Sequence, residues 1–276
     1  MRAVQLIAPG FGGINLEDIS APRCFEVERR LRDLLDIPVF HDDQHGTAIV
    51  VMAALTNALR VVGKKLPEVR IAMAGAGAAG TAVLKLLLGA GATQVMVADD
   101  RGAVHLGRPG LNPSLRWIAE NTNRDGYAGD LAGALRGADV FIGLSAPHIL
   151  EAGDIEAMAR NAIVFALANP EPEVDPDAAG DYAAVVATGR SDYPNQINNV
   201  LAFPGVFRGL LDAQSRHISD EMLIAAAQAL ADVVSPDEIG PHYIIPSVFH
   251  PDVTSSVAAA VRDAVLSDTG TAELER

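Results

Sequence analysis

The sequence contains few cysteine, lysine and aromatic residues, and these shortages exclude several classes of protein. Cys24 is the single cysteine of 276 residues, so no disulfide can form within the chain, which suits a reducing cytoplasm. Only 21 Lys and Arg residues face 35 Asp and Glu residues, giving a formal net charge of −14. No basic patch is visible, and this charge argues against binding to the phosphate backbone of nucleic acids.

Long hydrophobic runs are also lacking. The apolar stretch at the N-terminus is too short for a signal peptide. The longest apolar helix candidate, residues 48–59, is interrupted by Thr56 and Asn57 and falls short of the roughly 20 residues of a membrane span. We therefore expect a cytoplasmic chain without membrane contact.

Short β-branched segments alternate with helical segments from about residue 69 onwards. We predict strands at 69–74, 94–98, 140–142, 162–168 and 183–187. This alternation is typical of an α/β fold with a doubly wound parallel sheet, the Rossmann-like arrangement. After Asn199 the pattern becomes mainly helical, with helices predicted at 203–215, 221–233 and 253–266.

A glycine fingerprint follows the first predicted strand, in the order Gly75-Ala76-Gly77-Ala78-Ala79-Gly80. The glycines permit a tight turn, close approach of the backbone to a pyrophosphate, and close packing of helix on strand. Asp99 ends the next strand, where a carboxylate binds the adenosine ribose and favours NAD over NADP. Arg101 can instead meet a 2′-phosphate, so NADP stays possible.

Two acidic pairs near the start of the chain indicate a metal site. They are Glu17-Asp18, after Gly12-Gly13-Ile14-Asn15-Leu16, and Asp42-Asp43, after Pro38-Val39-Phe40-His41. Carboxylates of this kind suit hard cations such as Mg²⁺ or Mn²⁺. Helix caps and solvated surface charge are the alternative explanation. His41 and His45 are expected to be ordinary loop residues outside any metal site.

Four longer motifs carry a resemblance to the bacterial malic enzymes. They are residues 12–25, 40–47, Ala166-Leu167-Ala168-Asn169-Pro170-Glu171-Pro172-Glu173, and the stretch 189–199. The resemblance covers nearly the whole chain. It implies metal-dependent oxidative decarboxylation of L-malate to pyruvate and CO₂ with reduction of NAD or NADP.

The resemblance also implies roles for single residues. Glu17, Asp18 and Asp43 would be the metal ligands, with Asp42 a catalytic-site acid close beside them. Asn169 would lie at the nicotinamide side of the cofactor, and Asn198 and Asn199 would bind the malate carboxylates. Capping of a backbone turn is the alternative for any one asparagine.

Two groups of the family's machinery have no counterpart here. Family members use an upstream lysine as base and an upstream tyrosine as acid, whereas only sixteen residues precede Glu17 and no lysine or tyrosine of the chain matches either. We expect the C-terminal part of a malic enzyme, with impaired activity when alone and a homodimeric or higher homo-oligomeric state.

The resemblance divides the chain into three parts. Residues 1–42 would be a remnant of the catalytic domain, 43–198 the NAD(P)-binding domain, and 199–276 helices that pack with the catalytic domain. One alternative is a non-catalytic NAD- and metal-binding fragment or partner subunit of a full-length malic enzyme. Another is an oxidoreductase for a different hydroxy or amino acid.

Overall fold

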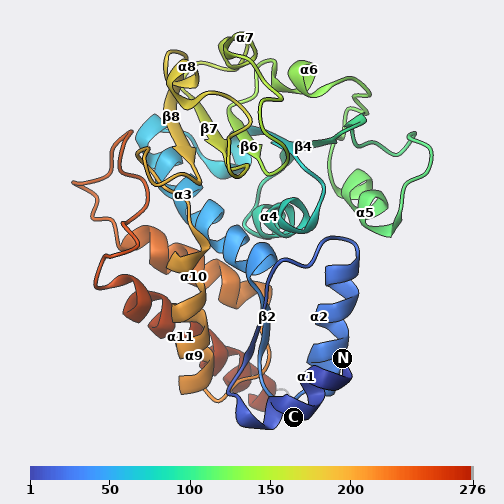
Figure 1. Cartoon of the computed structure of the whole chain (residues 1–276). Helices are drawn as coiled ribbons and strands as arrows, with labels where there is room; N and C mark the ends of the chain where they lie inside the picture. Colours follow the sequence, from blue (N-terminus) through green and yellow to red (C-terminus); the bar gives the residue numbers. More distant parts are fainter. Residues whose placement is uncertain (275–276) are drawn as a thin grey trace.

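The fold is built around a six-stranded sheet with helices on both faces and below it (Figure 1). This computed structural model describes the backbone of residues 1–274 and the side chains of residues 1–267. The strand order is β5-β4-β3-β6-β7-β8, and all neighbours are parallel except the short β5, which is antiparallel to β4. The strands are β3 (Arg70–Ala74), β4 (Gln94–Asp99), β5 (Gly102–Ala103), β6 (Val140–Gly143), β7 (Ala162–Ala166) and β8 (Ala183–Thr188).

The predicted doubly wound sheet is therefore confirmed. Every residue of β6 and β7 is buried, as expected for central parallel strands covered on both faces. The order reverses between β3 and β6, and ligands of such sheets bind in the crevice beyond the carboxyl ends of the strands at this point. The helices among these strands are α4 (Ala78–Gly89), α5 (Pro113–Asn121), α6 (Leu131–Leu135), α7 (Ala152–Glu156) and α8 (Pro176–Gly180).

The helical C-terminal part is confirmed as well. It consists of α9 (Phe203–Asp212), α10 (Asp220–Asp232) and α11 (Val253–Leu274). These three helices pack together below the sheet, at the lower left in Figure 1. Helix α11 extends eight residues beyond its predicted end at residue 266.

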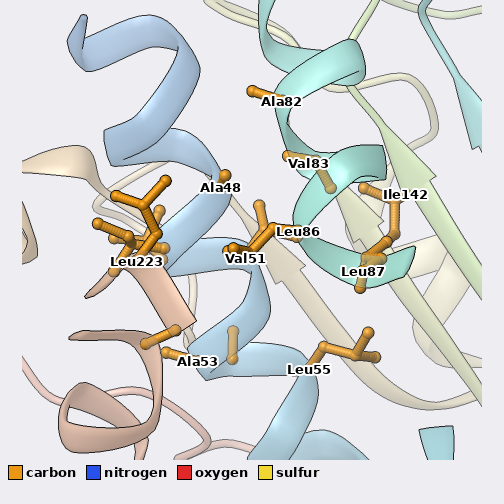
Figure 2. Packing of buried hydrophobic residues seen from close by; sticks show 14 of the residues in the cluster. Ala48, Val51, Ala53, Leu55, Ala82, Val83, Leu86, Leu87, Ile142 and Leu223 are labelled. Carbon is orange, nitrogen blue, oxygen red and sulfur yellow. The ribbon is translucent and has the colours of Figure 1, made fainter. Parts of the chain in front are cut away.

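Helix α3 (Thr47–Val62) is the most deeply buried helix of the fold. Eleven of its sixteen residues are buried, and it ends where Gly63 adopts a left-handed φ of 67°. It packs against α4 on one flank and α10 on the other. Figure 2 shows Val51 of α3 beside Leu86 of α4, and Leu223 of α10 beside the opposite flank of α3.

The expectation that no segment reaches the length of a membrane span is wrong for the segment that contains α3. The helical stretch Asp42–Val62 is 21 residues long and apolar enough to cross a membrane by length and composition. The interruption by Thr56 and Asn57 does not stop the helix, because both polar side chains find backbone carbonyl partners. Its apolar side chains are buried in the protein core, which accounts for their hydropathy.

The N-terminal part forms a second, smaller sheet. Strand β1 (Ile14–Leu16) pairs in parallel with β2 (Val39–His41), with Leu16 opposite His41. Helices α1 (Arg2–Ile7) and α2 (Arg23–Leu34) accompany these strands. A small cluster including Leu16, Leu31 and Val39 forms their core. Because the strands are parallel, the residues that follow them meet at the same edge.

The predicted boundaries at residues 42/43 and 198/199 stay a prediction. The largest cluster of buried residues runs from Phe40 to Val265 and includes the sheet, α3 and the C-terminal helices.

Asn57 provides a test of how α3 is held. Its Nδ2 donates to the carbonyls of Ala231 and Ile244 at 2.9 and 3.0 Å, and the residue is fully buried. We predict that Asn57→Leu lowers the free energy of unfolding by about 2–4 kcal/mol, because both carbonyls lose a buried donor.

The matched control is Thr56→Ala, which removes a hydrogen bond to Met52 within the same helix only. Urea unfolding should show a loss below about 1 kcal/mol for this control. Equal losses for the two variants would contradict the role of Asn57 as a tie between helices.

Candidate functional site

The two acidic pairs lie side by side at the edge of the small sheet. Glu17 and Asp18 follow β1, and Asp42 and Asp43 follow β2, its parallel neighbour. The backbone N–H of Asp18 donates to Oδ2 of Asp43 at 2.8 Å, with Asp18 at a left-handed φ of 57°. Parallel pairing thus brings together residues that are 25 positions apart.

Asp42 is the buried member of this group, with only 5% of its surface exposed. Its Oδ1 is buried and has no hydrogen-bond partner. Burial raises the pKa of Asp42 to about 6; the hydrogen bond from Asn199 lowers it, and the charges of Glu17 and Asp43 raise it. Asp42 is therefore a carboxyl group whose negative charge the protein poorly compensates.

The C-terminal part of the chain reaches this group through Asn199. Its Nδ2 donates to Oδ2 of Asp42 at 3.3 Å, and its Oδ1 accepts from Thr47 Oγ1 at 3.2 Å. Asn198 is used differently: its Oδ1 accepts from the backbone N–H of Val200 and begins a short helical turn. Capping thus accounts for Asn198 in this chain, while Asn199 lies at the acidic group.

The histidines beside the acidic pairs have other surroundings. His45 Nε2 lies 2.6 Å from Oε1 of Glu28, which also pairs with Arg32. His41 is fully buried, and its Nδ1 lies 3.9 Å from Oδ2 of Asp43. Burial lowers the pKa of His41, which favours the neutral imidazole, while the nearby Asp43 raises it. That both histidines stay outside a metal site remains a prediction.

The acidic group has carboxylate oxygens that could bind a cation, but its side chains are not arranged as a complete set of ligands around one point. Among the described residues no cluster of three or more His, Cys, Asp and Glu side chains is arranged to hold a metal. The donor chemistry nevertheless fits Mg²⁺ or Mn²⁺, because no Lys or Arg forms an ion pair with Glu17, Asp18 or Asp43 in that part of the chain. The unpartnered Oδ1 of Asp42 agrees with this fit.

The glycine fingerprint forms the turn between β3 and α4, as predicted. Gly75 has φ of 109°, and a Cβ there would lie 2.4 Å from the Leu144 carbonyl oxygen. A Cβ on Gly80 would lie 2.0 Å from the Gly75 carbonyl oxygen. Gly77 has open space around it, so its lack of a side chain leaves room for a ligand next to the N-terminus of α4.

Asp99 ends β4 as predicted, but its carboxylate already has partners. Its Oδ1 accepts the backbone N–H of Arg101 at 2.9 Å, and its Oδ2 forms an ion pair with Arg108. The Arg108 side chain is almost completely buried. The sequence analysis missed Arg108, because no local sequence pattern indicates that it pairs with Asp99, nine residues earlier.

The loop after β7 carries Asn169 near the same crevice. Asn169 is exposed, and its amide lies close to Gly189, where a Cβ would be 3.3 Å from Oδ1. Four residues further on, Glu173 is fully buried. Burial raises the pKa of Glu173, while the backbone N–H groups of Ala168 and Ser145 lower it. Sequence reasoning quoted Glu173 in a motif but assigned it no role.

The comparisons with known proteins bear on this geometry. Residues 44–266 match the family model described as "Malic enzyme, NAD binding domain". The chain belongs to the malic enzyme family. It is 56% identical over 264 residues to the NAD-dependent malic enzyme of Geobacillus stearothermophilus, with 96% of this chain and 55% of that protein covered.

Two further malic enzymes match this chain over most of its length. The bifunctional malic/malolactic enzyme of Bacillus subtilis is 49% identical over 276 residues, which cover 99% of this chain and 67% of that protein. The crystal structure of the NAD-dependent malic enzyme of Thermotoga maritima matches with a TM-score of 0.90 and 46% identity, over 95% of this chain and 69% of that one. The chain thus spans about half to two thirds of the length of these malic enzymes.

Two glycines of the fingerprint test the cofactor site separately from the fold. Gly80→Ala should lower the free energy of unfolding of the cofactor-free chain by about 1–3 kcal/mol, because the new methyl group meets the Gly75 carbonyl. Gly77→Ala should change the free energy of unfolding by less than about 0.5 kcal/mol. It should weaken NADH binding by a factor of about ten or more, because the new methyl group occupies the space beside the turn. Urea unfolding and NADH fluorescence titration measure the two effects. Unchanged NADH binding by Gly77→Ala would refute the assignment.

Because burial raises the pKa of Asp42, we predict that the stability of the metal-free chain depends on pH. In the folded chain the pKa of Asp42 is about 6, above its ordinary value of 3.8. The stabilising contribution of Asp42 is therefore present below pH 3.8 and is lost as the pH rises through 6. Asp42→Asn removes this loss. In EDTA, the variant should gain about 2 kcal/mol of unfolding free energy over the wild type between pH 4.5 and 7.5. A pH-independent difference would contradict the burial of an ionisable Asp42.

Proposed function

We propose that this chain supplies the metal- and cofactor-binding part of an enzyme that oxidatively decarboxylates L-malate to pyruvate and CO₂ while reducing NAD or NADP. The observation that carries the proposal is the pairing of β1 with β2, which brings two acidic pairs together in a chain that also carries the dinucleotide fingerprint. Relatives of this chain are NAD- and NADP-dependent malic enzymes, which supports the same reaction.

In this proposal Glu17, Asp18 and Asp43 hold Mg²⁺ or Mn²⁺. A bound divalent cation supplies Lewis acidity to the hydroxyl and carboxylate of a hydroxy acid. Asp42 adds negative charge next to the ligands and is kept in place by Asn199. Asn199, which accepts a hydrogen bond from Thr47, and its neighbour Asn198 would bind the malate carboxylates.

The fingerprint turn and the N-terminus of α4 bind the pyrophosphate of the dinucleotide. Unpaired N–H groups at the start of α4 donate to the phosphates, and Gly77 allows close approach. Asp99 favours NAD, while the ion pair with Arg108 reduces its net charge next to the ribose. Asn169 faces the nicotinamide half, beyond β7.

The chain's own lysines and tyrosines do not supply the base and acid. Lys64 pairs with Asp139 at 2.8 Å, Lys65 approaches Glu68, and Lys85 lies over the Trp117 ring. No hydrogen bond or ion pair joins any of these lysines, or any of the four tyrosines, to Glu17, Asp18, Asp42 or Asp43. We infer that the 276 residues alone turn over malate poorly.

This absence also supports a second candidate function. The chain would then be a non-catalytic NAD- and metal-binding unit, or a partner subunit whose base and acid come from a full-length malic enzyme.

The experiment is malate oxidation by the purified chain with Mn²⁺, measured as NADH or NADPH formation and pyruvate release. Since a general base and acid contribute about 10²–10⁴ in rate, we predict at least a hundredfold (roughly) lower rate than for the Geobacillus stearothermophilus enzyme. NADH binding, titrated in parallel, should remain. Turnover equal to that of the full-length enzyme would refute the inference about the missing base and acid.

Asp43→Asn tests the assignment of the metal ligands. If residual turnover exists, the variant should abolish it, and EDTA should do the same, whereas NADH binding stays unchanged. Residual turnover that survives both changes would contradict the metal assignment.

A further inference from the structure

Glu173 is a buried carboxylate that has hydrogen-bond donors but no cation. It is fully buried, and no Lys, Arg or His of residues 1–267 forms an ion pair with it. Its Oε1 accepts the backbone N–H of Ser145 at 2.9 Å, and its Oε2 accepts the backbone N–H of Ala168 at 3.0 Å. A buried charge without a cation is costly, and these two hydrogen bonds to backbone N–H groups offset part of that cost.

The two donors belong to different loops at the same edge of the sheet. Ser145 follows β6, and Ala168 follows β7 and precedes Asn169. One side chain therefore ties together the loops of two neighbouring parallel strands at their carboxyl ends, where dinucleotides bind. The backbone adds to this tie, because the N–H of Leu150 donates to the Glu173 carbonyl at 3.0 Å.

The sequence of β6 accommodates the carboxylate. A Cβ on Gly143 would lie 2.3 Å from the Glu173 carboxyl carbon, so the last residue of β6 has to be glycine for Glu173 to occupy this position. Next to Gly143, the Leu144 carbonyl oxygen lies 2.4 Å from the place of a Cβ on Gly75. The loop that Glu173 holds is thus packed directly on the first glycine of the fingerprint.

We propose that Glu173 is a positioning residue for the nicotinamide end of the cofactor site: its carboxylate fixes the loops after β6 and β7, and with them Asn169, in the arrangement that the dinucleotide requires. This inference rests on the proposed dinucleotide binding but not on turnover of malate. The adenosine end, which lies by β4 and Asp99 on the other side of β3, does not depend on Glu173.

The test compares the affinities of Glu173→Gln for NADH and for AMP. Glutamine has the same shape, but its NH₂ group would face one of two backbone donors, so one loop loses its acceptor. We expect NADH binding to weaken about tenfold and AMP binding, followed by NMR titration, to change less than about twofold. Glu156→Gln, an exposed residue of α7, is the matched control and should change neither.

Each other outcome overturns the inference. Equal losses for NADH and AMP would mean a general structural role, and no loss of NADH affinity would mean no role in the cofactor site. A wild-type chain that binds no NADH would refute it as well. Should Glu173→Gln not fold, Glu173→Asp keeps the charge but is too short to reach both loops, and the same NADH-to-AMP comparison decides. Failure to form pyruvate, by contrast, concerns only the proposed reaction.

Discussion

The burial of α3 is the constraint on which the rest of the structure depends. This helix begins at Thr47 and continues the helical turn Asp42–Gly46, which carries Asp42 and Asp43. It packs against α4 behind the glycine fingerprint, and α10 covers its other flank (Figure 2). Its position therefore fixes the acidic group relative to the dinucleotide turn. At about 25 cal/mol per Å² of apolar surface, a helix with eleven buried residues contributes a large share of the driving force for this arrangement.

The site is assembled from loops at strand ends, and polar contacts between distant segments complete it. Asn199 reaches Asp42 across 157 residues, Arg108 reaches Asp99, and Glu173 reaches the loops after β6 and β7. Each contact fixes a segment that lies at or beyond the end of a strand. Such a scaffold keeps the cofactor turn fixed and leaves the acidic carboxylates uncompensated, as a site for a cation requires.

Much of the fold and part of the site could be predicted from the sequence. The strand, the glycine turn and Asp99 form a local pattern, so the predicted bounds of β3 and β4 lie close to the observed ones. The proximity of the two acidic pairs followed from the family resemblance, and its structural cause is the parallel pairing of β1 with β2. The partners of Asp99 and Glu173 could not be predicted, because they depend on tertiary packing. The role of Asn57 also depends on tertiary packing. Its hydrogen bonds to the carbonyls of Ala231 and Ile244 could not be predicted from the sequence, nor could the continuation of α3 through this polar residue.

We propose that this chain binds a divalent cation at Glu17, Asp18 and Asp43 and a dinucleotide at the fingerprint. Anomalous X-ray diffraction from crystals grown with Mn²⁺ and NADH tests it directly. We predict one strong manganese peak within bonding distance of Glu17, Asp18 and Asp43, with the NADH pyrophosphate at Gly75–Gly80. A manganese peak elsewhere, or NADH bound with no manganese at these carboxylates, would contradict the account.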